Sequence, residues 1–203
     1  MTSGRCSRTQ IMDAAEQLFG SRGYTNVTIG QLCEASRLPV GSIYHHFGSK
    51  AGVLKAVLRR GTAEFFADMP TFDSLDGSAL ERLAAYYAAA ADLIAKRLPM
   101  FRLLTSLQLH QADSAEVQEI LREENERAHA DIVAFLEPVA RSCGVRSAAE
   151  CARELAPLNL VFATGLVACA ESMGMDIRTS ISSHLHRLIV VSILDRAGSP
   201  PGR

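Results

Sequence analysis

The side chains best suited to contact another molecule lie close together in residues 40–50. A tyrosine, two adjacent histidines and a lysine occur there, and all of them can donate hydrogen bonds to phosphate oxygens. Small residues precede them and would let a helix approach a second surface closely. We expect one outward-facing set with these members: Val40, Gly41, Ser42, Tyr44, His45 and His46.

Two short helices with a tight joint between them would present this set. The first would begin at Thr28, whose hydroxyl can accept a backbone N–H and cap the helix. Arg37 lies in the joint. The second helix would span Val40–Phe47 and end at Gly48, with Ile43 turned toward the core.

A third helix would open at Lys50, capped by Ser49. A helix N-terminus is itself an anion site, so Lys50 and the N–H groups beside it would act together on a phosphate. The pattern predicts a helix-turn-helix whose second helix lies in the major groove of DNA. The other interpretation is two amphipathic core helices joined by a turn, and spacing alone does not separate the two.

The segment GSIYHHFGSKAGVL, preceded by TIGQLCEASRLP and AAEQLFGSRGY, resembles the DNA-binding domain of the TetR family of bacterial transcriptional regulators. The resemblance ends near Arg60. It implies a homodimeric repressor that binds a near-palindromic operator and is released from it by a ligand. We place Thr28, Arg37 and Lys50 with the outward-facing set as predicted DNA contacts.

Three positions depart from the pattern of that family. Gly30 stands where a charged or polar residue is common, and it weakens its helix by up to about 1 kcal/mol relative to alanine. Arg37 replaces the usual glycine and must adopt the geometry of the turn. Val40 replaces a frequent lysine and could pack on a thymine methyl group. DNA binding remains the expectation, while the operator sequence stays open.

The composition predicts an all-α fold. Of the 203 residues, 48% are hydrophobic and only 6% aromatic, and no run of alternating β-branched residues occurs. We expect a three-helix, helix-turn-helix DNA-binding domain at residues 1–50. It would be joined to a larger helical ligand-binding and dimerisation domain at residues 51–203.

The net charge of −1 conceals an asymmetry along the chain. Residues 1–60 carry eight Lys or Arg and three Asp or Glu, whereas residues 61–203 carry thirteen basic and nineteen acidic residues. A basic head on an acidic body suits a protein that meets DNA with one end. Chance clustering is the alternative explanation of this imbalance.

The middle of the chain is rich in aromatic and apolar residues that could surround a small molecule. In the family that the chain resembles, ligand cavities lie in this part of the protein, and the ligands are often apolar or amphipathic. We therefore predict a small, mainly apolar or amphipathic effector. For each residue the alternative is ordinary core packing. The predicted ligand-binding residues are Phe65, Phe66, Met69, Tyr86, Tyr87, Met100, Phe101, Leu104, Gln108, His110, Phe135 and Phe162.

The last two helices are more apolar than a single outer layer needs. One follows Ser147 and the other is predicted at Ile177–Leu194. We expect them to form a four-helix bundle with their copies in a second subunit, because reading two half-sites requires a two-fold dimer. The alternative is that both pack wholly on their own subunit.

Gly61 lies near the middle of the helix that follows Ser49. It could be a flexible point that passes motion from the body to the head. The alternative is a close contact between two helices.

No motif in the sequence argues for an enzyme. The five cysteines are scattered without a C-x-x-C pair, and the histidines show no metal-ligand spacing. We expect no catalytic residues, no metal and no cofactor. The first residues do not resemble a signal peptide, and the uncharged stretch Leu155–Ala170 is short for a membrane span, so we expect a cytoplasmic protein.

The function predicted from these features is a ligand-responsive repressor of transcription. Its partners would be a double-stranded DNA operator, a small-molecule effector and a second copy of the chain, without a membrane. The alternative is a DNA-binding architectural or cell-division factor that has many genomic sites and no small-molecule inducer.

Overall fold

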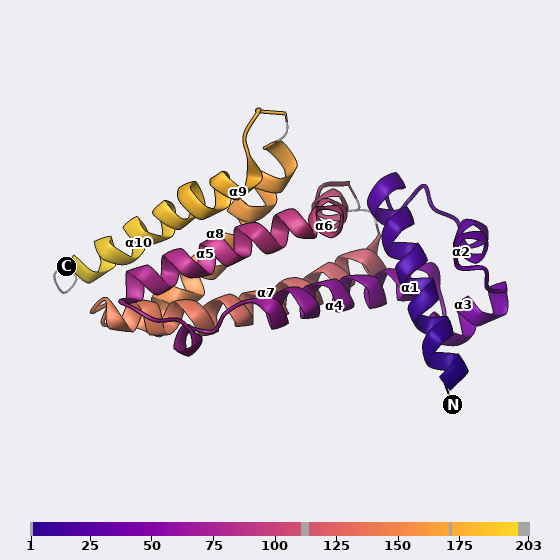
Figure 1. The fold of residues 1–203 in the computed structure, drawn as a ribbon, viewed down its shortest axis with the longest axis horizontal. Coiled ribbons are helices and arrows are strands. Elements are labelled where there is room, and N and C mark those ends of the chain that lie inside the picture. The colour runs from indigo at the N-terminus through magenta and orange to yellow at the C-terminus, as the bar shows by residue number, and fades with distance from the viewer. Residues whose placement is uncertain (1, 111–113, 171, 199–203) are drawn as a thin grey trace. The chain divides into compact units, whose positions relative to one another are not determined.

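The computed structural model describes residues 2–110, 114–170 and 172–198, and all regular structure in these ranges is helical (Figure 1). The predicted all-α fold class is therefore confirmed. The elements in chain order are α1 (Thr2–Arg22), α2 (Ile29–Ser36), α3 (Val40–Phe47), α4 (Lys50–Asp68), η1 (Phe72–Ser74), α5 (Ala79–Lys96), α6 (Leu98–His110), α7 (Ala115–Ser142), α8 (Ala148–Cys169), α9 (Ile177–Thr179), η2 (Ser180–Leu185) and α10 (His186–Gly198).

The chain packs as two compact units. The first unit comprises Met1–Glu64 and Pro99–Glu124, and the second comprises Phe65–Leu98 and Asn125–Arg203. Helices α4 and α7 each contribute residues to both units. This division follows packing rather than function, so the predicted domain boundary after residue 50 stays a prediction.

The first unit is built on one apolar core. Helices α1, α2 and α3 contact one another in pairs (Figure 1), and α4 adds a strongly apolar face to the same core. Full burial of one Val, Leu, Ile or Phe side chain stabilises a fold by about 1.5–3 kcal/mol. The fully buried members include Ile11, Ala15, Phe19, Val27, Leu32, Ile43, Val53, Leu54, Val57 and Leu58.

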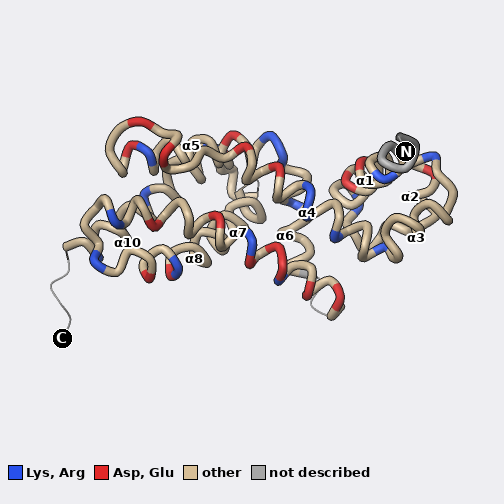
Figure 2. Tube along the Cα trace, turned by 90° about the horizontal axis from the view of Figure 1, so that it is seen from below, with Lys and Arg blue, Asp and Glu red and all other residues tan. Residues whose placement is uncertain are grey.

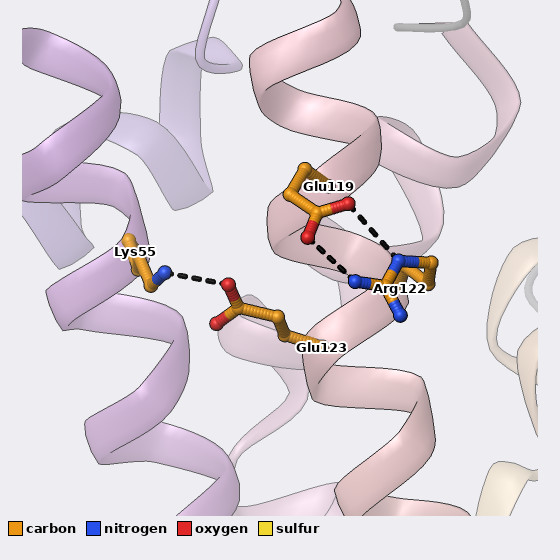
Figure 3. A network of polar contacts seen from close by, with 4 residues as sticks. All are labelled: Lys55, Glu119, Arg122 and Glu123. Carbon is orange, nitrogen blue, oxygen red and sulfur yellow. Dashed lines mark hydrogen bonds and ion pairs between the residues drawn. The ribbon is translucent and has the colours of Figure 1, made fainter.

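Ion pairs hold α4 within the first unit. The two terminal nitrogens of Arg60 donate to Asp13 and Glu16 of α1, each at 2.6 Å. On its other side α4 meets α7, where the Lys55 ammonium lies 2.7 Å from Glu123 (Figure 3). Charged residues of both signs are interspersed along α7 (Figure 2), so α7 can pair with α4 and remain well solvated.

A close approach between helices accounts for Gly61. A Cβ atom at this position would lie 2.9 Å from the Cγ atom of Met100 in α6. Gly61 is buried in the middle of the continuous helix α4. The contact interpretation therefore explains this glycine, and α4 shows no break that would mark a hinge.

The second unit is a bundle of α5 and the C-terminal helices. Helix α5 begins with a capping box, in which Ser78 accepts from the Glu81 amide and Glu81 accepts from the Ser78 amide. The side chain of Tyr87, fully buried in α5, accepts a hydrogen bond from Asn159 of α8. Contacts among α5, α8, η2 and α10 complete the bundle.

The predicted helix Ile177–Leu194 is present, but it contains a π-helical turn near its start. A π-helical turn, η2, separates α9 from α10, and α10 extends to Gly198. The buried residues recur every fourth position, at Ile181, Leu185 and Ile189. In an α-helix each such step rotates the stripe about 40° beyond a full turn, and the wider π turn takes back part of this rotation. The apolar stripe thus stays on one side.

Helix α8 is the one described helix whose length and composition would allow it to cross a membrane. A core helix of a water-soluble protein passes the same test. The expected cytoplasmic location therefore stays a prediction.

Candidate nucleic-acid interface and effector pocket

The start of α2 is fixed by a capping box. The Thr28 hydroxyl accepts a hydrogen bond from the Gln31 amide at 3.2 Å, and the Gln31 side-chain oxygen accepts from the Thr28 amide at 2.9 Å. This confirms the predicted cap at Thr28. Such a cap is worth about 1 kcal/mol and sets where α2 begins.

Arg37 adopts the left-handed conformation that the joint requires, with φ 56° and ψ 31°. This conformation costs a non-glycine residue about 1–2 kcal/mol. The Arg37 amide donates to the Glu34 carbonyl at 3.3 Å, and the Leu38 amide donates to the Cys33 carbonyl at 3.2 Å. The arginine side chain is exposed beside the start of α3.

Helix α3 has the predicted bounds, Val40–Phe47, and turns Ile43 fully into the core. Val40 is 51% exposed and Tyr44 is 53% exposed. Gly41 and His45 are also exposed, and no atom lies within 4 Å of a Cβ built at Gly41. The exposed residues therefore form one face with a small centre, as the sequence predicted.

The other two residues of the predicted outward-facing set are only half-exposed. Ser42 and His46 flank the exposed face of α3 rather than standing at its centre. The imidazole rings of His45 and His46 lie 5.1 Å apart in an edge-to-face arrangement. Ser42 and His46 can still reach, from the side, a ligand that lies along α3.

The end of α3 is joined to α4 by a tight turn. Gly48 has φ 73°, and the Ser49 hydroxyl accepts from the Gly52 amide at 2.9 Å, which confirms the predicted stop and cap. A Cβ at Gly52 would lie 1.9 Å from the Phe47 carbonyl oxygen, so this position admits only glycine. The turn thus sets the position of α3 on the first turn of α4.

Lys50 is held by its own chain, which the sequence did not predict. Its ammonium donates to the backbone carbonyls of Tyr24 at 2.9 Å and Val27 at 2.8 Å, and it lies 4.3 Å from the centre of the Tyr24 ring. Burial lowers the pKa of Lys50. An ammonium has three N–H donors, and these two carbonyls engage two of them.

The second unit contains a pocket of about 150 Å³, which we call the Asp131 pocket. It is bounded by the end of α4, the segment through η1, α5 and α7. Burial and then the charge of Asp131 raise the pKa of Tyr86. The lining residues are Phe66, Met69, Pro70, Thr71, Phe72, Tyr86, Asp131, Ala134 and Phe135.

Four of the predicted ligand-binding residues line this pocket, namely Phe66, Met69, Tyr86 and Phe135. Phe65 and Tyr87 are buried in the same unit but do not line it. Phe162 is 45% exposed on α8. The side chain of His110 lies outside the described residues. The remaining predicted residues belong to the first unit: Met100, Phe101, Leu104 and Gln108.

Sequence reasoning missed the other five lining residues. Phe72 lies in the polar segment between α4 and α5, and Asp131 ends a charged run of α7 that resembles an ordinary solvated face. The lone phenylalanine among polar residues was the available signal at Phe72. No sequence signal marked Asp131.

Helix α8 exposes an apolar surface. Its exposed residues Leu158, Val161 and Phe162 recur at helical spacing, and Gly165 and Cys169 continue the same face with small side chains. Val191 and Leu194 of α10, which contacts α8, are exposed as well. Among the described residues, no group of three or more His, Cys, Asp or Glu side chains could hold a metal ion.

Residues 11–57 match the family model "Bacterial regulatory proteins, tetR family". The similarity to this family is thus shown for the N-terminal segment that contains α2 and α3. It is 39% identical over 59 residues to the HTH-type transcriptional repressor KstR2 of Rhodococcus jostii (strain RHA1), and this match covers 29% of either chain. Similarity to this relative is thus confined to less than a third of its length.

Solved structures resemble nearly the whole chain in fold. A putative TetR-family transcriptional regulator from Rhodococcus sp. has a TM-score of 0.76 at 17% identity, over 93% of this chain and 99% of that one. The transcriptional regulator FadR from Bacillus subtilis, in complex with stearoyl-CoA, has a TM-score of 0.71 at 19% identity, over 91% and 98%. At these identities the likeness concerns the fold.

Proposed function

We propose that this protein is a homodimeric transcriptional repressor that binds a near-palindromic operator and is released from it by a small molecule. The observation that carries the proposal is the exposed face of α3, with Val40, Gly41, Tyr44 and His45 outward while Ile43 anchors the helix. A helix with a small leading edge can enter the major groove. The match to regulators named as repressors supports the assignment.

The predicted DNA contacts divide by chemistry. Val40, Gly41 and Ser42 stand at the N-terminal end of α3, where recognition helices meet base edges. Tyr44, His45 and His46 would donate to phosphates and fix the register, as would Arg37. Thr28, at the exposed N-terminus of α2, would offer its hydroxyl to the adjacent phosphate backbone of the DNA.

Lys50 has a double role in this proposal. Two of its donors tie α4 to the Tyr24–Val27 loop, and the third would reach a phosphate together with the first amides of α4. Its positive charge would thus contribute to DNA affinity only while the internal bonds orient it.

The exposed apolar face of α8 supports the proposed dimer. A stripe that includes Val161 and Phe162 would be covered by the same stripe of a second copy, with Gly165 allowing close helix approach. Exposed Val191 and Leu194 of α10 would extend the same interface. Two α3 helices related by a two-fold axis can then read half-sites about 34 Å apart.

The effector would bind in the Asp131 pocket and act by shifting populations. Helices α4 and α7 run through both units, so a change in their second-unit portions can be passed to the first unit. Release by 100-fold requires about 2.7 kcal/mol of coupling, which is within the usual range. We propose no enzymatic activity, and a cytoplasmic location.

The test is the binding of DNA fragments by the purified protein and by the variant Tyr44→Ala. We expect the wild type to retain a few specific fragments and the variant to lose most of its affinity for them. Equal retention by both proteins would contradict the role of α3. Many dispersed sites, insensitive to any metabolite, would favour the architectural role instead.

A further inference from the structure

The Asp131 pocket combines a single charged residue with a mostly apolar and aromatic lining. Asp131 is the one ionisable carboxylate or cation among its described lining residues. Within the described chain, no hydrogen bond or ion pair engages the Asp131 carboxylate. Thr71 and Tyr86 supply hydroxyl groups, and the remaining lining is apolar or aromatic. A negative charge without a counter-ion therefore stands at an aromatic cavity.

Four aromatic rings line the same cavity, those of Phe66, Phe72, Tyr86 and Phe135. The face of an aromatic ring carries partial negative charge and attracts cations, especially where water is excluded. The Asp131 carboxylate and the four rings thus both favour a cationic ligand. An anionic group would meet repulsion from Asp131 and no compensating positive charge in the lining.

The aromatic walls are held in place before any ligand arrives. Tyr86 and Phe135 stack with their ring centres 3.8 Å apart. Arg82, which does not line the pocket, donates to the Phe72 carbonyl at 3.0 Å and lies 4.6 Å from the centre of its ring. A wall fixed in this way loses little entropy when a ligand binds.

The volume restricts the size of the bound group. A cavity of about 150 Å³ has room for a molecule the size of benzene. It accommodates a small alkylammonium head group but not a long acyl chain, whereas typical pockets for whole ligands are about 300–1,000 Å³.

We propose that the Asp131 pocket binds an organic ammonium group, with Asp131 as its counter-ion and the four rings as its walls. This names the chemical class of the effector and rests on the proposed function as a ligand-released regulator. It replaces the expectation of a mainly apolar effector with a cationic head group in an aromatic pocket.

The experiment compares two probes of nearly equal shape that differ in charge. They are the tetramethylammonium cation, added as its chloride, and the neutral tert-butanol. Binding to the full chain is measured by calorimetric titration and by the shift in Tm, with sodium chloride added to match ionic strength. We expect tetramethylammonium to bind and to raise Tm, and tert-butanol to do neither at the same concentration.

Two carboxylates near the pocket provide a matched pair of variants. Asp131→Asn removes the lining charge and should weaken tetramethylammonium binding by about tenfold or more. Asp73→Asn removes an exposed charge next to Phe72 that does not line the pocket, and it should leave the affinity nearly unchanged. Phe72→Leu, which keeps the charge and removes one ring, should weaken binding by a smaller factor.

The outcomes separate this inference from the regulatory function, provided that binding to genomic DNA fragments is measured on the same samples. If the protein binds specific fragments but not tetramethylammonium, the ammonium inference fails alone. Equal binding of both probes, or full affinity in Asp131→Asn, would also overturn it. If tetramethylammonium binds in the predicted order of variants and no fragment is selected, the ammonium site stands and the repressor function fails.

Discussion

The α3 surface and the Asp131 pocket are constructed in opposite ways. The exposed face of α3 lies within a span of eight consecutive residues, and a single core residue, Ile43, anchors its centre. The pocket instead collects residues from position 66 to position 135, brought together by packing. A surface made by one helix depends on local geometry, whereas a cavity depends on how several helices meet.

This difference explains what the sequence could predict. The Thr28 cap and the bounds of α3 follow from residue types within a few positions of each other. They were predicted correctly because capping and turn geometry are local effects.

The pocket could not be predicted in the same way. Asp131 has charged neighbours along α7, as an ordinary solvated face does, and only tertiary structure places it beside Tyr86. Met100 was expected near the ligand, yet it packs against Gly61 in the first unit. A pattern of apolar residues does not say which of several helices each will face.

The largest expected effect is a loss of operator binding that leaves ligand binding in the Asp131 pocket unchanged. Val161→Asp combined with Phe162→Asp puts charge on the exposed apolar face of α8, which should prevent dimer formation. Operator affinity should fall by about 100-fold or more, because two linked half-sites become independent. Binding of tetramethylammonium should persist, since the pocket lies within one chain.

Sedimentation and fragment binding would measure this prediction. Ala84→Asp, an exposed position on α5, is the control and should leave the mass of the particle unchanged. A dimer that survives the double substitution with full operator affinity would show that α8 is not the interface.

The next effect concerns the internal hydrogen bonds of Lys50 at the start of α4. Lys50→Met keeps the length of the side chain but removes both bonds to the carbonyls of Tyr24 and Val27. Stability should fall by about 2 kcal/mol, because two acceptors lose a charged donor. Lys55→Met, which removes a partly exposed ion pair with Glu123, should cost under about 1 kcal/mol.

Urea unfolding of the two lysine variants would test this ranking. If Lys55→Met proved the more destabilising, the internal bonds of Lys50 would not be what fixes the start of α4. Weaker operator binding is expected for Lys50→Met, with a shallower dependence on salt.

A smaller change should affect α3 alone. Tyr44→Phe removes one exposed hydroxyl and should weaken operator binding severalfold, equivalent to about 1 kcal/mol, without altering stability or the binding of tetramethylammonium. Fluorescence anisotropy on a selected fragment would measure it, with Tyr86→Phe as the matched change in the pocket. The account would be wrong if Tyr86→Phe reduced operator affinity more than Tyr44→Phe did.

The smallest effect is a pH dependence in the second unit. Burial lowers the pKa of His186 below its ordinary value. The unfolded chain therefore binds the proton more readily, and stability should fall as the pH drops through the ordinary histidine range near 6.5. The decline between about pH 7 and pH 5 should be shallower in His186→Phe.

Thermal unfolding at several pH values would detect this change of slope. His184→Phe, an exposed position two residues away, is the control. Identical slopes in the wild type and His186→Phe would mean that burial of His186 does not contribute to acid sensitivity.

The most direct test of the account is to select genomic fragments with the wild type, Val40→Ala and Ser42→Ala at physiological salt. We predict a few sites with inverted half-sites about one helical turn apart, and a changed base preference at the same position of both half-sites in each variant. Sites without inverted symmetry, or base preferences that neither variant alters, would contradict the claim that paired α3 helices read the operator.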